Sequence, residues 1–158
     1  PTAHTTPTGS QSNKLTTSAD ISEASIEDLV IQIMDTRDAR GLRIPNNPQQ
    51  IIVPNALMFE ANRIVKSVLQ NDTSNNAVNV IRALNIFPKG ILTNRYLSDS
   101  DAWFIQTDMP EGLTHYTRMP WTFDKDNDFE TKNAKASVVG RLSAGWSNWR
   151  QIYGTDGA

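Results

Sequence analysis

The 158-residue sequence predicts an α+β fold with one long helix, a second helix and several short strands joined by loops. Three observations predict it. Apolar residues recur with helical spacing from Ile26 to Met34. Short β-branched or aromatic runs occur at 51–54 and 102–105. Only 38% of residues are apolar and 20% are charged, while 15 threonines and 14 asparagines indicate an ordered, loop-rich chain.

The first twenty residues are rich in Thr and Ser and show neither helical nor strand periodicity, so we expect an extended arm or loop, or a disordered tail. The long helix is expected over 23–40. Ser22 is its predicted N-cap, and Ile21 and Ile26 occupy the two positions of a hydrophobic staple. Gly41 is the expected residue just after the helix, where glycine often ends one.

Prolines interrupt the connector that follows. The β-branched segment Ile51–Pro54 then predicts a buried strand. The second helix is expected from Pro54 to Leu69, followed by an Asn-dense loop at 70–79 that contains a glycosylation sequon at Asn71. The other expected elements are strands at 78–87, 91–97, 102–107 and 136–146, with a polar, aromatic region at 113–123 and a charged, hairpin-like stretch at 124–132.

The composition excludes several classes of protein. Without cysteine the chain cannot hold a disulfide framework, a thiolate zinc site or a cysteine nucleophile. No apolar run approaches the ~20 residues of a membrane span, and no secretion signal is visible. A net charge of −2 argues against a broadly basic nucleic-acid binder. His4 and His115 lie in unlike regions, so we expect no catalytic residue, no cofactor site and no metal site.

The spacing of Asp124, Asp126 and Asp128 matches the first calcium ligands of an EF-hand loop. The sixth position should be glycine and is Phe129, while the twelfth should be glutamate and is Lys135. The sequence therefore does not match an EF-hand loop at either of these two positions. A solvated acidic turn balanced by lysines is favoured, with a looser calcium site as the alternative.

Aromatic residues and arginines crowd the C-terminal part of the chain. They are Trp146, Trp149, Tyr153, Arg141 and Arg150. Trp, Tyr and Arg dominate the energetics of protein interfaces, and arginine packs well over tryptophan. The same residues would also fill a small local core. The sequence leaves both interpretations open.

Three segments in order resemble major capsid proteins of tailed bacteriophages. They are Ile51–Leu57 before a helix, Tyr96–Phe104 as a strand–turn–strand, and the ending that runs from Phe129–Lys132 through Arg141–Arg150 to Tyr153-Gly154. The resemblance spans the chain from about residue 20 to the end. It rests on the order and spacing of the segments, because no single one is diagnostic.

The resemblance implies the capsid fold of the Hong Kong phage type, with the helix at 23–40 as the spine helix. The implied parts are an arm or loop at 1–20, the peripheral-domain spine helix and connector at 21–50, an axial domain at 51–116 and a return to the peripheral domain at 117–158. Members of this family are typically longer and carry an arm and an extended loop before the spine helix. We therefore expect the chain to be the C-terminal portion of a subunit.

The implied function is structural and not enzymatic. Subunits would assemble through hexamers and pentamers into an icosahedral head shell that encloses viral DNA, which would touch the inner face weakly and non-specifically. Scaffolding and decoration proteins are further candidate partners, no membrane contact is expected, and the location would be the virion after assembly in the host cytoplasm. The candidate subunit contacts are Asp124, Asp126, Asp128, Lys132, Trp146, Trp149 and Arg150.

Two alternatives remain open at the level of sequence. One is a non-catalytic carbohydrate- or receptor-binding module that uses Trp103, Trp121 and Trp146. The other is a small hydrolase that uses the acidic turn. If the shell interpretation holds, alanine at both Trp149 and Arg150 should reduce assembly, whereas either alternative predicts dispersed monomers.

Overall fold

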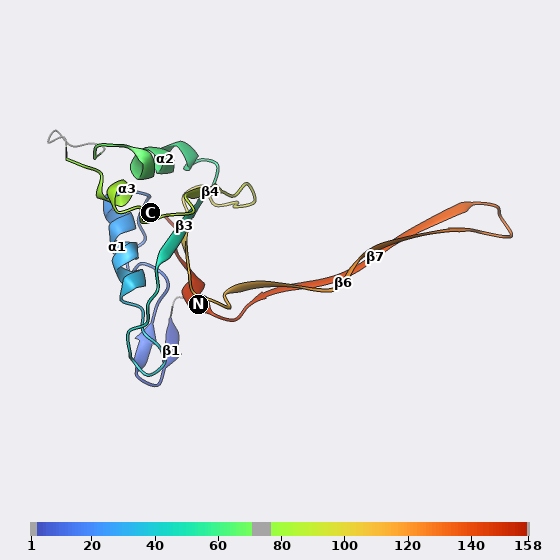
Figure 1. Cartoon of the computed structure of the whole chain (residues 1–158), viewed down its shortest axis with the longest axis horizontal. Helices are drawn as coiled ribbons and strands as arrows, with labels where there is room; N and C mark the ends of the chain where they lie inside the picture. The colour runs from blue at the N-terminus through green and yellow to red at the C-terminus, as the bar shows by residue number, and fades with distance from the viewer. Residues whose placement is uncertain (1–2, 71–76, 158) are drawn as a thin grey trace. The chain divides into compact units, whose positions relative to one another are not determined.

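A computed structural model describes residues 3–70 and 77–157. The chain divides into two compact units. The sheet unit comprises Pro1–Pro110 and Trp149–Ala158, and the hairpin unit comprises Glu111–Asn148. Strands outnumber helices among the described residues, which confirms the predicted α+β class (Figure 1).

The sheet unit is built on four strands in the order β4-β3-β5-β8. Their bounds are β3 Pro48–Val53, β4 Ile91–Thr93, β5 Trp103–Thr107 and β8 Ile152–Thr155. The β3–β4 pair is parallel, whereas β3–β5 and β5–β8 are antiparallel. Ile51 stands opposite Ile105, which stands opposite Tyr153, so three adjacent strands present one row of buried side chains.

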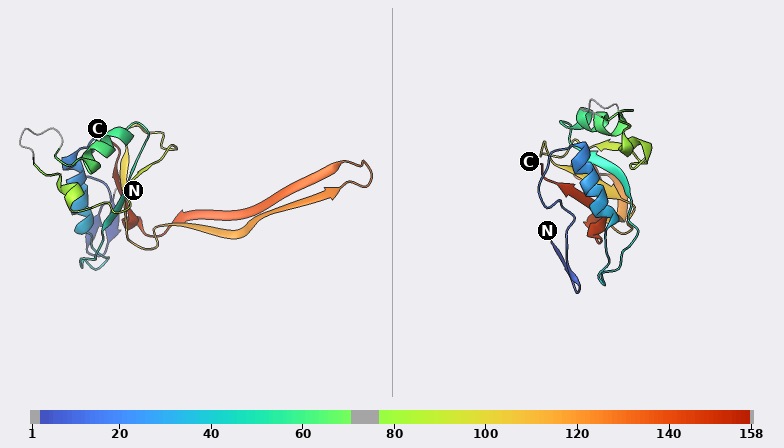
Figure 2. Two further views of the ribbon diagram at one scale, coloured as in Figure 1. Left: turned by 45° about the horizontal axis from the view of Figure 1, so that its top comes forward. Right: turned by 90° about the vertical axis from the view of Figure 1, so that its left-hand side faces the viewer.

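Helix α1 (Glu23–Met34) covers this face of the sheet (Figure 2). The predicted cap is confirmed, since the Ser22 hydroxyl accepts a hydrogen bond from the Ser25 backbone amide at 3.1 Å. The two residues of the predicted staple, Ile21 and Ile26, are both buried in the core. The same core holds Leu29 and Ile33 of the helix together with the inner side chains of β3 and β5.

The predicted end of this helix at residue 40 is wrong. The helix stops at Met34, and Asp35 is its C-cap. A turn follows, because the Asp38 carboxylate accepts hydrogen bonds from the backbone amides of Arg40 and Leu42. Gly41 adopts φ +85° within this turn, so the glycine serves a turn six residues beyond the cap.

Helix α2 (Met58–Lys66) is confirmed in type but is shorter than expected at both ends. The strand predicted at 78–87 is wrong, because residues Val80–Ala83 form the short helix α3. Asn79 causes the change: its side-chain oxygen accepts from the Arg82 amide, and its Nδ2 donates to the carbonyl of Ile64 in α2. The Asn71 sequon lies outside the described residues.

Both ends of the sheet unit carry structure that sequence patterning did not predict. Strands β1 (His4–Thr6) and β2 (Gly9–Gln11) form a small hairpin where an arm or loop was expected. At the other end, a 3-10 turn, η1 (Trp149–Gln151), leads into β8, where no helix or strand was predicted. The strand predicted over 91–97 is shorter as β4, and the one at 102–107 is confirmed as β5.

The hairpin unit is one antiparallel pair, β6 (Leu113–Asn127) and β7 (Ala134–Trp146) (Figure 1). Fifteen residues at about 3.4 Å each make β6 roughly 50 Å long. At its root, the Ser147 amide donates to the Gly112 carbonyl at 3.1 Å. Strand-forming residues thus extend on both sides of the stretch that was predicted to be hairpin-like.

Candidate interaction surfaces

The hairpin unit exposes large apolar side chains. Trp121 is 69% exposed, Trp146 is 59% exposed and Phe123 is 58% exposed. Other exposed apolar residues on the two strands are Leu113, Tyr116, Val138, Val139 and Leu142. Of the described residues in β6 and β7, none is fully buried. The hairpin therefore presents apolar area to its surroundings along most of its length.

Cross-strand pairing organises these side chains. Leu113 stands opposite Trp146 near the root, and Phe123 stands opposite Val138 farther out. Between them the register shifts twice, between Thr117 and Met119 and again before Thr122. Trp121 lies in this irregular part, and its ring rests on Gly140, where an added Cβ would come within 2.6 Å of the indole. Gly140 thus leaves room for the exposed tryptophan.

The far end of the hairpin carries the predicted acidic stretch. Asp126 stands opposite Lys135, which also forms an ion pair with Asp128 at 2.9 Å. Hydrogen bonds from Lys135, and secondarily from Thr131, hold the pKa of the half-buried Asp128 carboxyl below its usual value. Lys132 lies over the Phe129 ring, 4.6 Å from its centroid.

These contacts do not assemble a cation site. Asp124 stands opposite Ser137, and the lysines of the stretch supply compensating charge. No group of three or more His, Cys, Asp or Glu side chains that could hold a metal ion occurs within residues 3–70 and 77–157.

The aromatic and arginine residues near the C-terminus fall into both units. Trp149 stacks on the His4 ring, with centroids 4.1 Å apart and planes 3° apart. The Arg150 guanidinium lies 4.4 Å from the Trp149 ring centroid, and its Nε donates to the Arg37 carbonyl at 3.0 Å. Tyr153 lies 6.3 Å from Trp149. In the sheet unit these residues therefore join the N-terminal hairpin to the core, while Trp146 and Arg141 belong to the hairpin unit.

Tyr153 anchors a buried polar network. Its hydroxyl lies 2.6 Å from the Thr36 hydroxyl, which donates to the Ile33 carbonyl. Because Thr36 has one proton and gives it to that carbonyl, Tyr153 is the donor in their contact. Asn46 donates to Thr36 from the other side. Burial raises the pKa of the Tyr153 phenol, so it remains protonated and able to donate.

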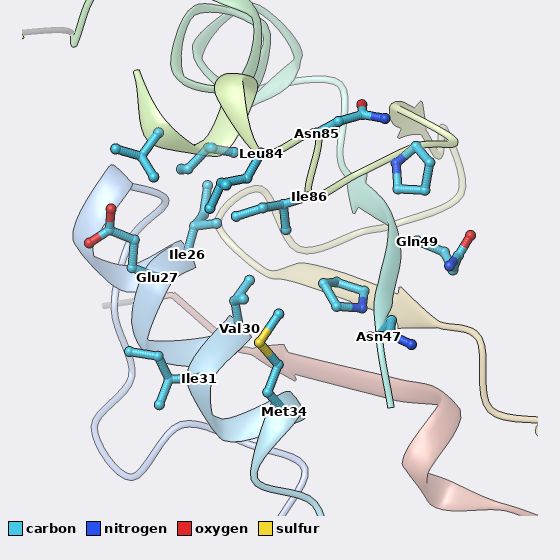
Figure 3. A pocket seen from close by; sticks show the side chains of 14 residues that line it. Ile26, Glu27, Val30, Ile31, Met34, Asn47, Gln49, Leu84, Asn85 and Ile86 are labelled. Carbon is cyan, nitrogen blue, oxygen red and sulfur yellow. The ribbon is translucent and has the colours of Figure 1, made fainter. Parts of the chain in front are cut away.

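An apolar groove lies between α1, α3 and the start of β3, with a volume of about 490 Å³ (Figure 3). Ile31 and Met34 contribute from α1, and Leu84 contributes from the end of α3. All three side chains are about half exposed or more. Sequence reasoning assigned Met34 to the core face and missed this groove. The sequence signal for the groove is the apolar-rich segment Val78–Phe87. It carries more apolar side chains than a four-residue helix can bury.

The structure argues against the alternative of a module that binds through Trp103, Trp121 and Trp146. Trp103 is fully buried, and its indole nitrogen donates to the Ala19 carbonyl at 3.2 Å. It is a core residue and offers no surface to a ligand. Trp121 and Trp146 remain exposed on the hairpin.

Comparison with known proteins gives a family. A family described as phage capsid protein matches residues 1–154. A solved structure, a virus-like particle from Pyrococcus furiosus, is similar at a TM-score of 0.49 and 14% identity. That match covers 90% of this chain and 55% of that chain, so this chain spans about half the length of its structural neighbour. No curated protein matches. Among the described residues, no helix is both long and apolar enough to cross a membrane. Because the family match covers nearly the whole sequence, the chain belongs to the phage capsid protein family.

Proposed function

We propose that the chain is a structural subunit that associates with copies of itself to form a capsid shell, without catalysis. The observation that carries this proposal is the exposed hairpin of β6 and β7 with its apolar side chains. A two-stranded hairpin on its own is marginally stable in water, and exposed apolar area marks contact surfaces. A neighbouring subunit would cover these side chains.

The shell we propose is the icosahedral head of a tailed phage, built from hexamers and pentamers and enclosing DNA. Family membership and the resemblance of three sequence segments support it. In this proposal α1 is the spine helix, residues 51–116 belong to the axial domain, and residues 117–158 return to the peripheral domain. Contacts between unlike surface patches of identical subunits form rings when the rotation between neighbours closes, as such a shell requires.

The proposed contacts on the hairpin are apolar along the strands and charged at the far end. Trp146 supplies apolar area near the root. Asp124, Asp126, Asp128 and Lys132 supply charges for pairing with a neighbour. Trp149 and Arg150 also remain in the proposed set. Their contacts with His4 and Arg37 mean that alanine there would disturb the subunit itself, so these two positions are poor probes of assembly.

Removing the hairpin tests the proposal directly. Gly112 and Ser147 are hydrogen-bonded neighbours, so a short Gly-Ser link between them can replace residues 113–146. We expect the shortened chain to keep its sheet unit, because no strand of the four-stranded sheet lies in the removed segment. Circular dichroism and thermal unfolding would establish the fold, and negative-stain microscopy would show dispersed subunits in place of shells or rings.

A point variant refines the test. Trp121→Thr with Phe123→Thr keeps β-forming residues while removing apolar area, and should strongly reduce the yield of particles. The matched control is Thr117→Val, which alters an exposed hairpin position without removing apolar area. Normal particle yield from both the shortened chain and the double variant would show that the hairpin is not an assembly contact.

A further inference from the structure

A second pocket lies where the end of α2 meets α3 and the turn before β4. Its volume is about 280 Å³. Ile81 and Phe87 are buried and form its apolar back. Lys66 and Arg82 line it and are exposed, so charged groups stand at the edge of an otherwise apolar hollow.

Positive charge is concentrated around this pocket. Residues 61–70 and 77–90 contain four basic residues and no acidic one, although the chain as a whole has a net charge of −2. The four are Arg63, Lys66, Arg82 and Lys89, all exposed. The ion pairs found in the described part of the chain involve none of them. In sequence order the nearest acids are Glu60, at the start of α2, and Asp72, which lies outside the described residues; Glu27 lines the neighbouring groove.

The geometry leaves hydrogen-bond donors available. Arg82 Nη1 donates to the Lys66 carbonyl at 3.1 Å, which fixes the guanidinium against the last turn of α2 and leaves its other N–H groups. Asn85, also on the pocket wall, adopts φ +50°, and no hydrogen bond of its side chain is found in the described residues. A guanidinium, an ammonium and an amide are the donors that bind a phosphate group.

We propose that this pocket binds a phosphate of a nucleic-acid backbone. Backbone contact fits better than base recognition, because Phe87 is buried and no aromatic side chain lining the pocket is exposed for stacking. Binding is therefore independent of base sequence and dependent on salt. The inference deepens the proposed capsid function, on which it rests for the identity of the nucleic acid, by naming the residues through which a subunit touches packaged DNA.

The test compares two double variants that have the same net charge. Lys66→Gln with Arg82→Gln alters the pocket, and Arg40→Gln with Arg95→Gln removes two exposed cations elsewhere in the sheet unit. Fluorescence anisotropy with a mixed-sequence DNA duplex, between about 50 and 200 mM salt, gives the slope of log K against log salt. One phosphate held in the pocket contributes roughly −0.9 to this slope, so the pocket variant should reduce the slope by about one. The control should keep the slope of the original chain.

Each other outcome overturns the inference. Equal losses in the two double variants would show a general effect of charge, and absence of DNA binding by the unaltered chain would exclude the site. Failure of inorganic phosphate to compete with DNA would contradict a phosphate pocket. A chain that binds inorganic phosphate but does not bind DNA would assign the pocket to a small anion. Lys66→Arg should keep the slope of the unaltered chain, because it keeps the positive charge. A reduced slope in Lys66→Arg would indicate that Lys66 has a merely structural role.

Microscopy separates this inference from the proposed function. The pocket variant should still form shells, because Lys66 and Arg82 lie outside the hairpin. A chain that binds DNA through the pocket but never forms shells would contradict the capsid proposal and leave the pocket assignment standing.

Discussion

Close packing at single residues explains why β8 joins the sheet. Gly154 stands opposite Phe104, and a Cβ at Gly154 would come within 2.4 Å of the Phe104 ring and 3.0 Å of the Trp103 carbonyl oxygen. The phenyl ring thus occupies the space that a side chain at position 154 would need. The absence of a side chain at Gly154 lets β8 approach β5 closely.

Gly154→Ala should therefore destabilise the chain by about 1–3 kcal/mol, because the backbone carbonyl near the new methyl group cannot move easily. Gly145→Ala is the matched control, since a Cβ at that position would have no atom within 4 Å and the residue also lies in a strand. Urea unfolding of both variants measures the difference. Equal midpoints would show that the sheet adjusts at no cost.

Ionisation of the buried Tyr153 phenol should destabilise the folded chain at alkaline pH. Burial raises its pKa in the folded chain above the ordinary value of 10.0, so the folded state holds the proton more tightly than the unfolded state does. Its contribution is complete below pH 10 and is lost as the pH rises through the folded pKa. Tyr153→Phe should cost about 1 kcal/mol at neutral pH through the lost bond to Thr36. It should also flatten the decline above pH 10, measured by urea unfolding at several pH values.

At the scale of elements, local signals account for how α1 begins. The Ser22 hydroxyl accepts from the Ser25 amide, and the Ser25 hydroxyl accepts in return from the Ser22 amide at 2.9 Å. This reciprocal arrangement is a capping box with serine in the third position. It satisfies backbone donors that would otherwise have no partner at the start of the helix.

Ser22→Ala should lower the free energy of unfolding by about 1 kcal/mol, because the Ser25 backbone amide then loses its acceptor. Ser98→Ala, at an exposed loop position, should leave it unchanged within about 0.5 kcal/mol. Thermal unfolding followed by circular dichroism would compare the two. A loss in Ser98→Ala as large as that in Ser22→Ala would contradict the capping argument.

Elements with strong local patterns were predictable, and those that depend on distant partners were not. The cap at Ser22 and the β-branched run of β3 are visible in the sequence. The helix α3 was missed because an apolar run of this kind suits either a strand or a helix, and the deciding hydrogen bond reaches from Asn79 to Ile64, 15 positions away. The apolar groove was missed for the same reason, since α1 and α3 are separated by 45 residues and the pattern of neither one reveals the other.

The predicted contact residues were only partly placed by sequence reasoning. The charged stretch was recognised as hairpin-like, but its continuation into strands of 15 and 13 residues was not. Alternation between apolar and polar residues is weak there, because both faces of the hairpin are exposed and neither requires a consistent pattern. The role of these residues in assembly remains a prediction.

At the scale of the whole molecule, the exposed area suits a chain that buries surface in an assembly. The chain exposes 10635 Å², whereas a compact monomer of 17.6 kDa is expected to expose about 7,900 Å². Large apolar side chains contribute to this area in both units, Leu84 in one and Trp121 in the other. The low apolar fraction of the sequence therefore coexists with apolar area left for partners.

If burial of apolar area drives assembly, shells should persist in 1 M NaCl and should form more readily in ammonium sulfate, which strengthens apolar burial. Light scattering and negative-stain microscopy across both salts would measure this. Dissociation in 1 M NaCl would instead assign the dominant contacts to the charged stretch around Asp126 and Lys132, because salt screens exposed ion pairs.

The root of the hairpin has an evolutionary consequence. Its two strands leave and return through Gly112 and Ser147, which face each other across one hydrogen bond. Residues can therefore be gained or lost from both strands together, two per strand at a time, without moving any side chain to the opposite face. Related subunits that share the same sheet are free to differ in the length of this hairpin. If the hairpin contacts a neighbouring subunit, as proposed, lengthening or shortening it would change how far apart two subunits can lie and still be in contact.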